Sequence, residues 1–205
     1  MFDAMPSSAE CETLELIRRL GVVRPRDLED HGIPRGRLYR LATKGLVERS
    51  GRGLYVASDH APTEAHALVL VAKRVPGAIV CLISALRFHD LTTQLPREVW
   101  IAVPGKARRP KLEYPPLRVT RFSGRAFTEG VETHHIEGVD VKITSVGKTV
   151  ADCFKYRHKI GLDVALEALR QAWRERRVTI DELGRFARIC RVERVMRPYV
   201  ESLVA

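Results

Sequence analysis

Cysteine is scarce in this 205-residue sequence, and the four residues present lie far apart. Cys11, Cys81, Cys153 and Cys190 form no C-x-x-C pair, so the sequence predicts neither a zinc ribbon nor a disulfide scaffold. Each cysteine has apolar neighbours, and we therefore expect all four to be buried, reduced thiols.

Long apolar runs are also missing. No run approaches the roughly 20 residues that a membrane-spanning helix needs. The first residues, MFDAMPSSAECE, lack the basic and then apolar order of a signal peptide. With 45% hydrophobic and 29% charged residues, the composition is that of a soluble globular protein. We expect a cytoplasmic protein without a membrane partner.

The common catalytic signatures are absent from the sequence. It contains no G-x-x-x-x-G-K, no G-x-S-x-G and no H-E-x-x-H, and it lacks the Gly-Ser and Asp-x-Asp pattern of a nucleotidyltransferase. His134 and His135 are neighbours on a predicted strand and point to opposite faces, which is poor geometry for chelating one metal. We therefore predict no enzymatic activity, no metal and no cofactor. A degenerate nuclease is the alternative, because Asp140-x-Lys142 resembles the end of a D…E-x-K site.

Positive charge, in contrast, is abundant. The formal net charge is +10 and the isoelectric point is about 9.8. Residues 1–57 contain ten Lys or Arg and eight Asp or Glu, so +8 of the excess lies in residues 58–205. Such a charge favours polyanions or an acidic protein as partners of both parts of the chain.

The stretch from Gly32 to Val56 has the pattern of a recognition helix followed by a two-stranded wing. Two helices are predicted before it, from about Ser8 to Leu20 and from Pro25 to His31. Pro34 opens the third helix and Gly45 follows its end. The outward faces of the third helix and the hairpin carry cationic and hydrogen-bonding side chains. The predicted DNA-binding residues are Arg35, Arg37, Tyr39, Arg40, Thr43 and Lys44 on the helix and Arg49 and Arg52 on the wing.

A single exposed arginine is most often only solvated. The order of three helices and a basic hairpin is what favours duplex DNA as the ligand, with Arg37 and Arg40 reading bases and Lys44, Arg49 and Arg52 contacting phosphates.

The remainder of the chain mixes helices and strands. After a linker near residues 57–62, Thr63 is predicted to cap a helix, and a short helix is expected at residues 84–91. Residues 78–83 before it fit either a strand or the helix's own beginning. Strands are predicted at residues 99–103 and 117–122, and residues 131–136 and 139–144 form a predicted hairpin through Glu137-Gly138. From residue 144 the pattern is helical, with a capping box at Thr179-x-x-Glu182.

The predicted fold class is thus α+β. An N-terminal winged helix-turn-helix (residues 1–58) is followed by an α/β domain (residues 59–205) with a mixed sheet and a helical C-terminal tail.

Two basic groups in the second part are candidates for a partner surface. The loop PGKARRPK, residues 104–111, is either a nucleic-acid finger or an ordinary solvated loop. Arginines on the exposed faces of the C-terminal helices exceed what solubility requires, which favours an acidic or nucleic-acid partner. The candidate residues are Lys106, Arg108, Arg109, Lys111, Arg174, Arg177 and Arg188.

The segments RGRLYRLATKGLVERSGRGLYV, LISALRFHDL, LPREVWIAVP and VDVKITSVGKTVADCFKY occur in this order before a helical tail. In this arrangement the chain resembles the AbiEi-type antitoxins of type IV toxin–antitoxin systems, which are winged-helix transcriptional regulators of viral (phage) defence. The resemblance implies that the N-terminal domain binds inverted repeats in the operon's own promoter. It also implies that the second domain neutralises a nucleotidyltransferase-type toxin. An autorepressing antitoxin is therefore the predicted function; the alternative is a stand-alone regulator without a toxin partner.

Overall fold

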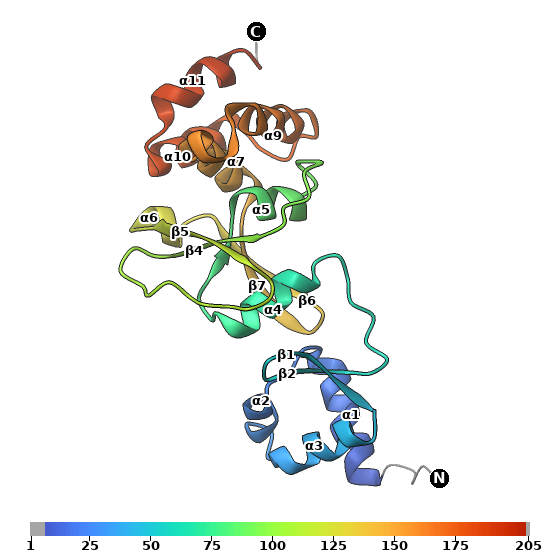
Figure 1. Cartoon of the computed structure of the whole chain (residues 1–205). Helices are drawn as coiled ribbons and strands as arrows, with labels where there is room; N and C mark the ends of the chain where they lie inside the picture. The colour runs from blue at the N-terminus through green and yellow to red at the C-terminus, as the bar shows by residue number, and fades with distance from the viewer. Residues whose placement is uncertain (1–6, 204–205) are drawn as a thin grey trace. The chain divides into compact units, whose positions relative to one another are not determined.

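The computed structural model describes residues 7–203, which divide into two compact units (Figure 1). One unit comprises the described residues up to Pro76 together with His135–Asp140. The other comprises Gly77–His134 and the described residues from Val141 onward. Each unit has a hydrophobic core of its own. The functional division at residue 58 stays a prediction.

The first helix has the predicted bounds because both of its ends are specified locally. Ser7 caps α1 (Ser8–Leu20): its hydroxyl accepts the Glu10 N–H, and the Glu10 carboxylate accepts the Ser7 N–H at 2.8 Å. Gly21, at φ +65°, ends the helix.

The next two helices end in the same kind of turn. In α2 (Pro25–Glu29), the Ile33 N–H donates to the Leu28 carbonyl across Gly32, which has a positive φ. In α3 (Arg35–Thr43), the Leu46 N–H donates to the Leu41 carbonyl across Gly45. These are Schellman turns. The turn after α2 tightens at His31, so the helix is shorter than predicted. Pro34 is the N-cap of α3 rather than its first helical residue.

The wing follows α3 directly. Strands β1 (Val47–Gly51) and β2 (Leu54–Ala57) pair antiparallel, and Val23 adds an isolated bridge to Tyr55. Helices and wing share a core that includes Ile17, Leu28 and Leu41, all fully buried. The predicted winged helix-turn-helix is thereby confirmed.

Helix α4 (His66–Arg74) begins later than predicted, and its N-cap is Ala65. Thr63 is not the cap. Its hydroxyl accepts the Ala65 N–H at 3.2 Å and donates to Glu137 at 2.7 Å, so it holds the chain just before the helix instead.

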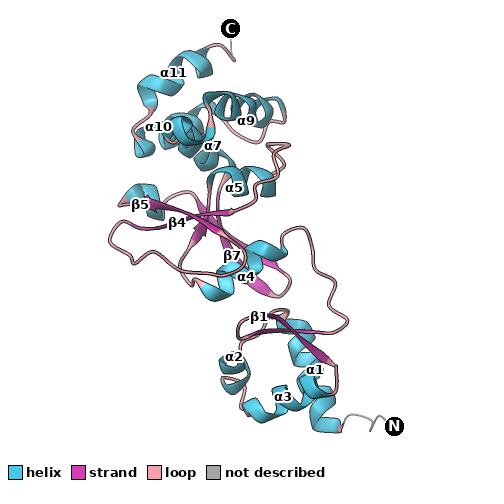
Figure 2. Cartoon of the chain, in the orientation of Figure 1, coloured by secondary structure: helices cyan, strands magenta, loops and turns pink. Residues whose placement is uncertain are grey.

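The second unit is built on a five-stranded mixed sheet of order β5-β4-β3-β7-β6 (Figure 2). β3 pairs antiparallel with β4 and parallel with β7, and β4 pairs parallel with β5. The ambiguous stretch before the short helix contains strand β3, and the helix α5 starts at residue 82, two residues earlier than predicted. The bounds are β3 (Ile79–Val80), α5 (Leu82–Phe88), β4 (Val99–Pro104), β5 (Leu117–Phe122), α6 (Arg125–Thr128), β6 (Val131–Ile136) and β7 (Val139–Thr144).

The predicted hairpin of β6 and β7 is confirmed. Its turn residues, Glu137 and Gly138, have φ values of +47° and +76°. Positive φ at both positions is the type I′ geometry that matches the twist of a hairpin, and it is costly for glutamate.

Five helices complete the second unit. Thr179 caps α10 by accepting the Glu182 N–H, as the sequence predicts. Phe154, Phe186 and Leu169 from three of the helices meet in the core that covers the sheet. The helices are α7 (Val146–Lys155), α8 (Arg157–Ile160), α9 (Leu162–Arg174), α10 (Ile180–Cys190) and α11 (Glu193–Glu201).

The expectation for the cysteines is wrong at one position. Cys81, Cys153 and Cys190 are buried, whereas Cys11 is exposed because it lies on the outer face of α1. Burial raises the pKa of the Cys81 and Cys153 thiols well above the ordinary value.

Candidate nucleic-acid interface

Helix α3 is amphipathic, and its packing decides which residues it presents to solvent. Leu38 and Leu41 are fully buried against α1 and α2. Because an α-helix has about 3.6 residues per turn, Tyr39, Arg40 and Thr43 then lie on the exposed side. Tyr39 is 49% exposed, a large value for an aromatic side chain, and its ring meets Tyr55 of the wing edge-on at 6.3 Å. The helix and the wing therefore form one continuous surface.

Three of the predicted DNA-binding cations have partners within the protein. Arg35 forms an ion pair with Glu29 at 2.5 Å. The Lys44 ammonium lies 2.8 Å from the Glu10 carboxylate, of which only 8% is exposed. Arg37 turns toward α1, where its guanidinium lies 3.4 Å from the Thr13 hydroxyl. These contacts fix the helices to one another.

The Glu10–Lys44 pair also joins the start of α1 to the end of α3. The hydrogen bond from Lys44, with that from the Ser7 backbone, lowers the pKa of Glu10 to about 2. This pair uses one of the three donors of the Lys44 ammonium, whose side chain is 32% exposed.

The other predicted cations are more accessible. Within residues 7–203, Arg40 and Arg52 have no ion-pair partner, and both are exposed. Among the described residues, Arg49 donates to the backbone carbonyl of Gly51, at 3.2 Å, and to no side chain. The wing is itself anchored, because the Arg74 guanidinium donates to the Arg52 carbonyl. Of the cations on this surface, Arg40, Arg49 and Arg52 thus have the fewest side-chain contacts with the rest of the protein.

A partly buried cluster that the sequence did not reveal lies beside the wing, where the His66 ring contacts the Ser50 hydroxyl at 3.0 Å. The Glu137 carboxylate, 3% exposed, accepts hydrogen bonds from Thr63 and contacts ring nitrogens of His60 at 3.0 Å and His66 at 2.6 Å. Burial alone raises the pKa of Glu137, but the hydrogen bonds from His66, Thr63 and His60 lower it to about 2. More than 70 residues separate Glu137 from these partners in the sequence, so no local pattern could have revealed the cluster.

The β6–β7 turn, which contains Glu137, lies close to the end of α1. A Cβ atom on Gly21 would lie 1.6 Å from the Glu137 carbonyl oxygen, so only glycine fits there. The β6–β7 turn is in this way an integral part of the unit that contains the wing.

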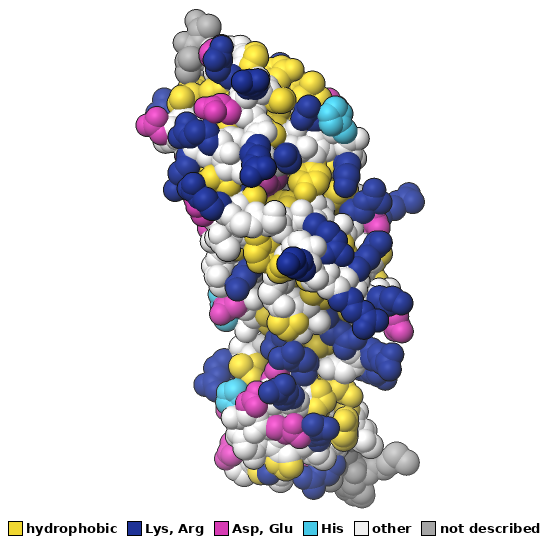
Figure 3. Space-filling view, turned by 90° about the vertical axis from the view of Figure 1, so that its left-hand side faces the viewer, with side chains coloured by type: hydrophobic (Ala, Val, Ile, Leu, Met, Phe, Trp, Pro, Cys, Tyr) yellow, Lys and Arg dark blue, Asp and Glu magenta, His cyan; other side chains and the backbone are white. Residues whose placement is uncertain are grey.

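The basic residues predicted in the second unit do not form one site. Lys106, Arg108, Arg109 and Lys111 are exposed on the β4–β5 loop, and Arg174 is exposed at the end of α9. Arg177 donates to the His89 carbonyl, which gives it a structural role. Arg188 lines a cavity between α10, α7 and β5. In Figure 3, Lys and Arg side chains are spread over the visible face of this unit, with few acidic groups among them.

The histidines of β6 lie on opposite faces, as predicted. His134 packs against Phe88 with ring centroids 4.7 Å apart, and exposed His135 contacts Asp140. Asp140, the residue on which the nuclease alternative rests, is therefore engaged with a neighbouring strand residue on the surface.

None of the helices described between residues 7 and 203 combines the length and the apolar composition needed to cross a membrane. A comparison with curated proteins finds no match to the chain. Residues 12–58, which contain most of α1, the helix-turn-helix and the wing, match a family described as "Transcriptional regulator, AbiEi antitoxin". Over these residues the chain is similar to the AbiEi antitoxin transcriptional regulators.

Proposed function

We propose that the chain is a DNA-binding antitoxin that represses its own toxin–antitoxin operon and counteracts a nucleotidyltransferase-type toxin. The observation that carries the DNA-binding part is the surface of α3 and the wing, where Arg40, Arg49 and Arg52 are exposed and lack acidic partners within the described residues. A helix of this kind enters the major groove of duplex DNA, and a wing contacts the adjacent backbone.

The residues divide into two roles. Arg40 and Tyr39 stand at the centre of the exposed face of α3, where a guanidinium can donate two hydrogen bonds to the O6 and N7 atoms of guanine. Arg49 and Arg52 on the wing suit phosphate contacts, which add affinity without sequence preference. Arg35, Arg37 and Lys44 are flanking residues whose present partners, Glu29, Thr13 and Glu10, orient them.

Binding to the promoter is tested by fluorescence anisotropy with a duplex from immediately upstream of the gene and a scrambled duplex, each at two salt concentrations. Tight binding that prefers the promoter and weakens steeply with salt is expected. Equal, weak binding to both duplexes would mean that the positive charge gives only a general affinity for polyanions.

The variants Arg40→Ala and Arg52→Ala separate base reading from phosphate contact. Arg40→Ala is expected to weaken promoter binding by about 1–3 kcal/mol and to relax the preference for the promoter. Arg52→Ala is expected to weaken binding to both duplexes alike and to lower the salt slope by about 1. Arg19→Ala, which removes an exposed cation from α1, is the matched control and should leave binding unchanged.

The antitoxin part rests on the family description of residues 12–58 and on the basic surface of the second unit. It is tested by co-expression of the chain with the product of the adjacent gene. Rescue of growth from a nucleotidyltransferase-like product supports it. Promoter binding without rescue would favour the stand-alone regulator.

A further inference from the structure

A cavity of about 620 Å³ in the second unit carries a concentration of positive charge that DNA binding by the winged helix does not use. It is lined by residues of β5, α6, α7 and α10, so elements distant in the sequence converge on it. Its volume is within the range of about 300–1,000 Å³ typical of small-molecule sites. Its cationic side chains are Arg121, Arg125, Lys155, Arg185, Arg188 and Arg191.

The single carboxylate in the lining does not offset this charge. Asp152 is 2% exposed and lies 2.5 Å from the ammonium of Lys148, which is fully buried beneath it. Its second oxygen accepts a hydrogen bond from the Cys190 thiol at 3.2 Å. Asp152 is thus neutralised within the protein, and the cations around it have no acidic counterpart in the cavity wall.

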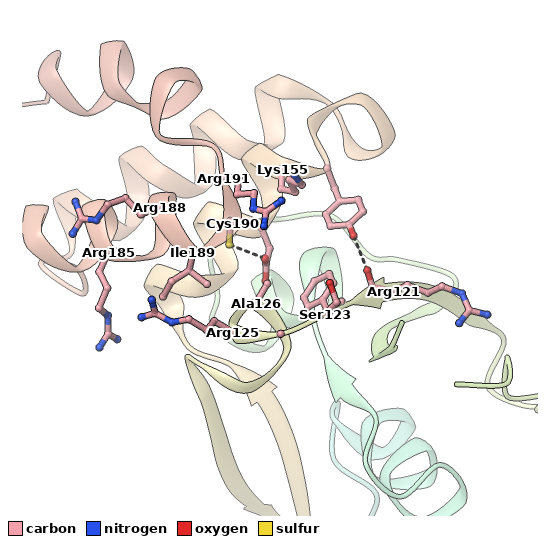
Figure 4. A pocket seen from close by; sticks show the side chains of 14 residues that line it. Arg121, Ser123, Arg125, Ala126, Lys155, Arg185, Arg188, Ile189, Cys190 and Arg191 are labelled. Carbon is pink, nitrogen blue, oxygen red and sulfur yellow. Dashed lines mark hydrogen bonds between the residues drawn. The ribbon is translucent and has the colours of Figure 1, made fainter. Parts of the chain in front are cut away.

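The six cations differ in how firmly they are held. Arg125 pairs with Glu129, and Arg188 lies 3.7 Å from Glu193. The Arg121 guanidinium donates to two loop carbonyls and points away from the cavity (Figure 4). The Arg185 guanidinium lies 4.5 Å from the centroid of the Phe186 ring. Lys155 and Arg191 form no salt bridge with any residue in the described part of the chain.

Figure 4 shows how the side chains are arranged around the floor of the cavity. In this view Lys155 and Arg191 appear above the hydrogen bond made by Cys190, and Ser123 and Arg125 appear below it. Cations that line one cavity repel one another, which favours the binding of an anion among them. Phe122 and Tyr156, whose rings stack 5.7 Å apart, give the lining an aromatic part as well.

Arg191 occupies its place at a conformational cost. It is the C-cap of α10 and has φ +57° and ψ +44°, the left-handed conformation that glycine adopts most readily. Its backbone N–H caps the helix by donating to the Ala187 and Arg188 carbonyls, and its side chain lines the cavity.

We propose that this cavity binds the phosphate groups of a small nucleotide, a nucleoside diphosphate or triphosphate. Each phosphate group brings a charge of about −1 to −2 and several strong hydrogen-bond acceptors, which suits guanidinium and ammonium donors. The aromatic and apolar lining suits the base or ribose. A hollow surrounded by cations fits a small ligand, whereas a nucleic-acid backbone is followed by an open groove or stripe.

The test is isothermal titration of the full chain with ATP, with pyrophosphate and with inorganic phosphate. Saturable binding of ATP is expected, with pyrophosphate weaker and inorganic phosphate weakest. The double variant Lys155→Gln/Arg191→Gly is expected to weaken ATP binding by about tenfold or more, since hydrogen bonds to charged groups are lost. Glycine suits the backbone at position 191, so thermal unfolding of Arg191→Gly should show a fold at least as stable as the original.

The matched control removes two exposed cations outside the cavity, in Arg170→Gln/Arg174→Gln, and should leave ATP binding unchanged. An equal loss in both double variants would mean non-specific attraction and would overturn the proposal. No saturable binding of ATP would do the same. So would tight binding of a short single-stranded oligonucleotide that ATP fails to displace, because that result would assign the surface to nucleic acid.

Discussion

The buried carboxylate of Glu137 is expected to stabilise the unit that carries the wing. In Glu137→Gln, one side-chain oxygen remains for the Thr63 N–H and hydroxyl, but an amide NH₂ replaces the oxygen that lies 3.0 Å from His60 and 2.6 Å from His66. Glu137→Gln therefore loses two charge-assisted hydrogen bonds, and the Glu137 side chain that forms them is only 3% exposed. At about 1–1.5 kcal/mol each, the expected loss is about 2–3 kcal/mol of unfolding free energy.

A second substitution at position 137 separates the contribution of the hydrogen bonds from that of the backbone strain in the turn. Glutamate at φ +47° costs about 1 kcal/mol or more, and asparagine tolerates that conformation better. Glu137→Asn is too short to keep the contacts with His60, His66 and Thr63, but it relieves the turn. The loss of four hydrogen bonds, at about 1–1.5 kcal/mol each, exceeds the strain relieved, so Glu137→Asn should be less stable than the original chain by about 3–5 kcal/mol.

The assay is differential scanning calorimetry of the full chain, with Glu48→Gln on the exposed surface of the wing as the control. A loss of about 2–3 kcal/mol in a unit of this size lowers the melting temperature by about 10 °C or more. Because the pKa of folded Glu137 is lowered to about 2, its contribution is complete above the unfolded value of 4.5 and is lost as the pH falls toward 2. The difference between the original chain and Glu137→Gln should shrink over that range. A shift no larger than that of Glu48→Gln, or a difference that persists at the acidic end, would refute the reasoning.

Three further predictions concern the cores. Asp152→Ala leaves the ammonium of Lys148 buried without its partner, and it should cost about 3–5 kcal/mol in thermal unfolding. Replacing both residues, in Lys148→Met/Asp152→Leu, should recover most of that loss; no recovery would mean that the pair is not the cause. Leu41→Ala removes a fully buried side chain from the winged-helix core and should lower the unfolding free energy by about 2–5 kcal/mol, whereas Thr43→Ala on the exposed side of the same helix should change it little. Under native conditions a thiol reagent should modify Cys11 rapidly and the three buried cysteines slowly, because burial raises the pKa of Cys190 to about 12 and raises the pKa of Cys81 and Cys153 well above the ordinary value. Rapid labelling of more than one thiol, read by mass spectrometry, would contradict the core described here.

Local sequence signals determined most elements of the fold. Ser7 and Glu10, Gly21 and Gly45, and the Thr179 cap specify helix ends through contacts between residues only a few positions apart. The alternation of Val139, Val141 and Ile143 with polar residues specified a half-buried strand. These signals sufficed to predict the winged helix, the hairpin and the α+β class, because each depends on short-range geometry and on which residues avoid water.

The tertiary structure decided which charges remain available to a partner. The sequence places Arg35, Arg37, Arg40 and Lys44 on one basic helix, yet Glu29, Thr13 and Glu10 engage three of them. The acidic partner of Lys44 lies 34 residues earlier, so its pairing follows from how α1 packs on α3.

Short-range patterns predicted most of the helices and strands, the cap at Thr179 and the excess of positive charge, but not the start of α4, where the cap is Ala65 and not Thr63. Only the tertiary structure joined Glu137 to His60 and His66, and only it gathered Lys155 and Arg191 around one cavity. The physical reason is the same for both sites. Their side chains meet because segments distant in the sequence pack together. Such contacts cannot be predicted from hydrophobic periodicity or from local propensity.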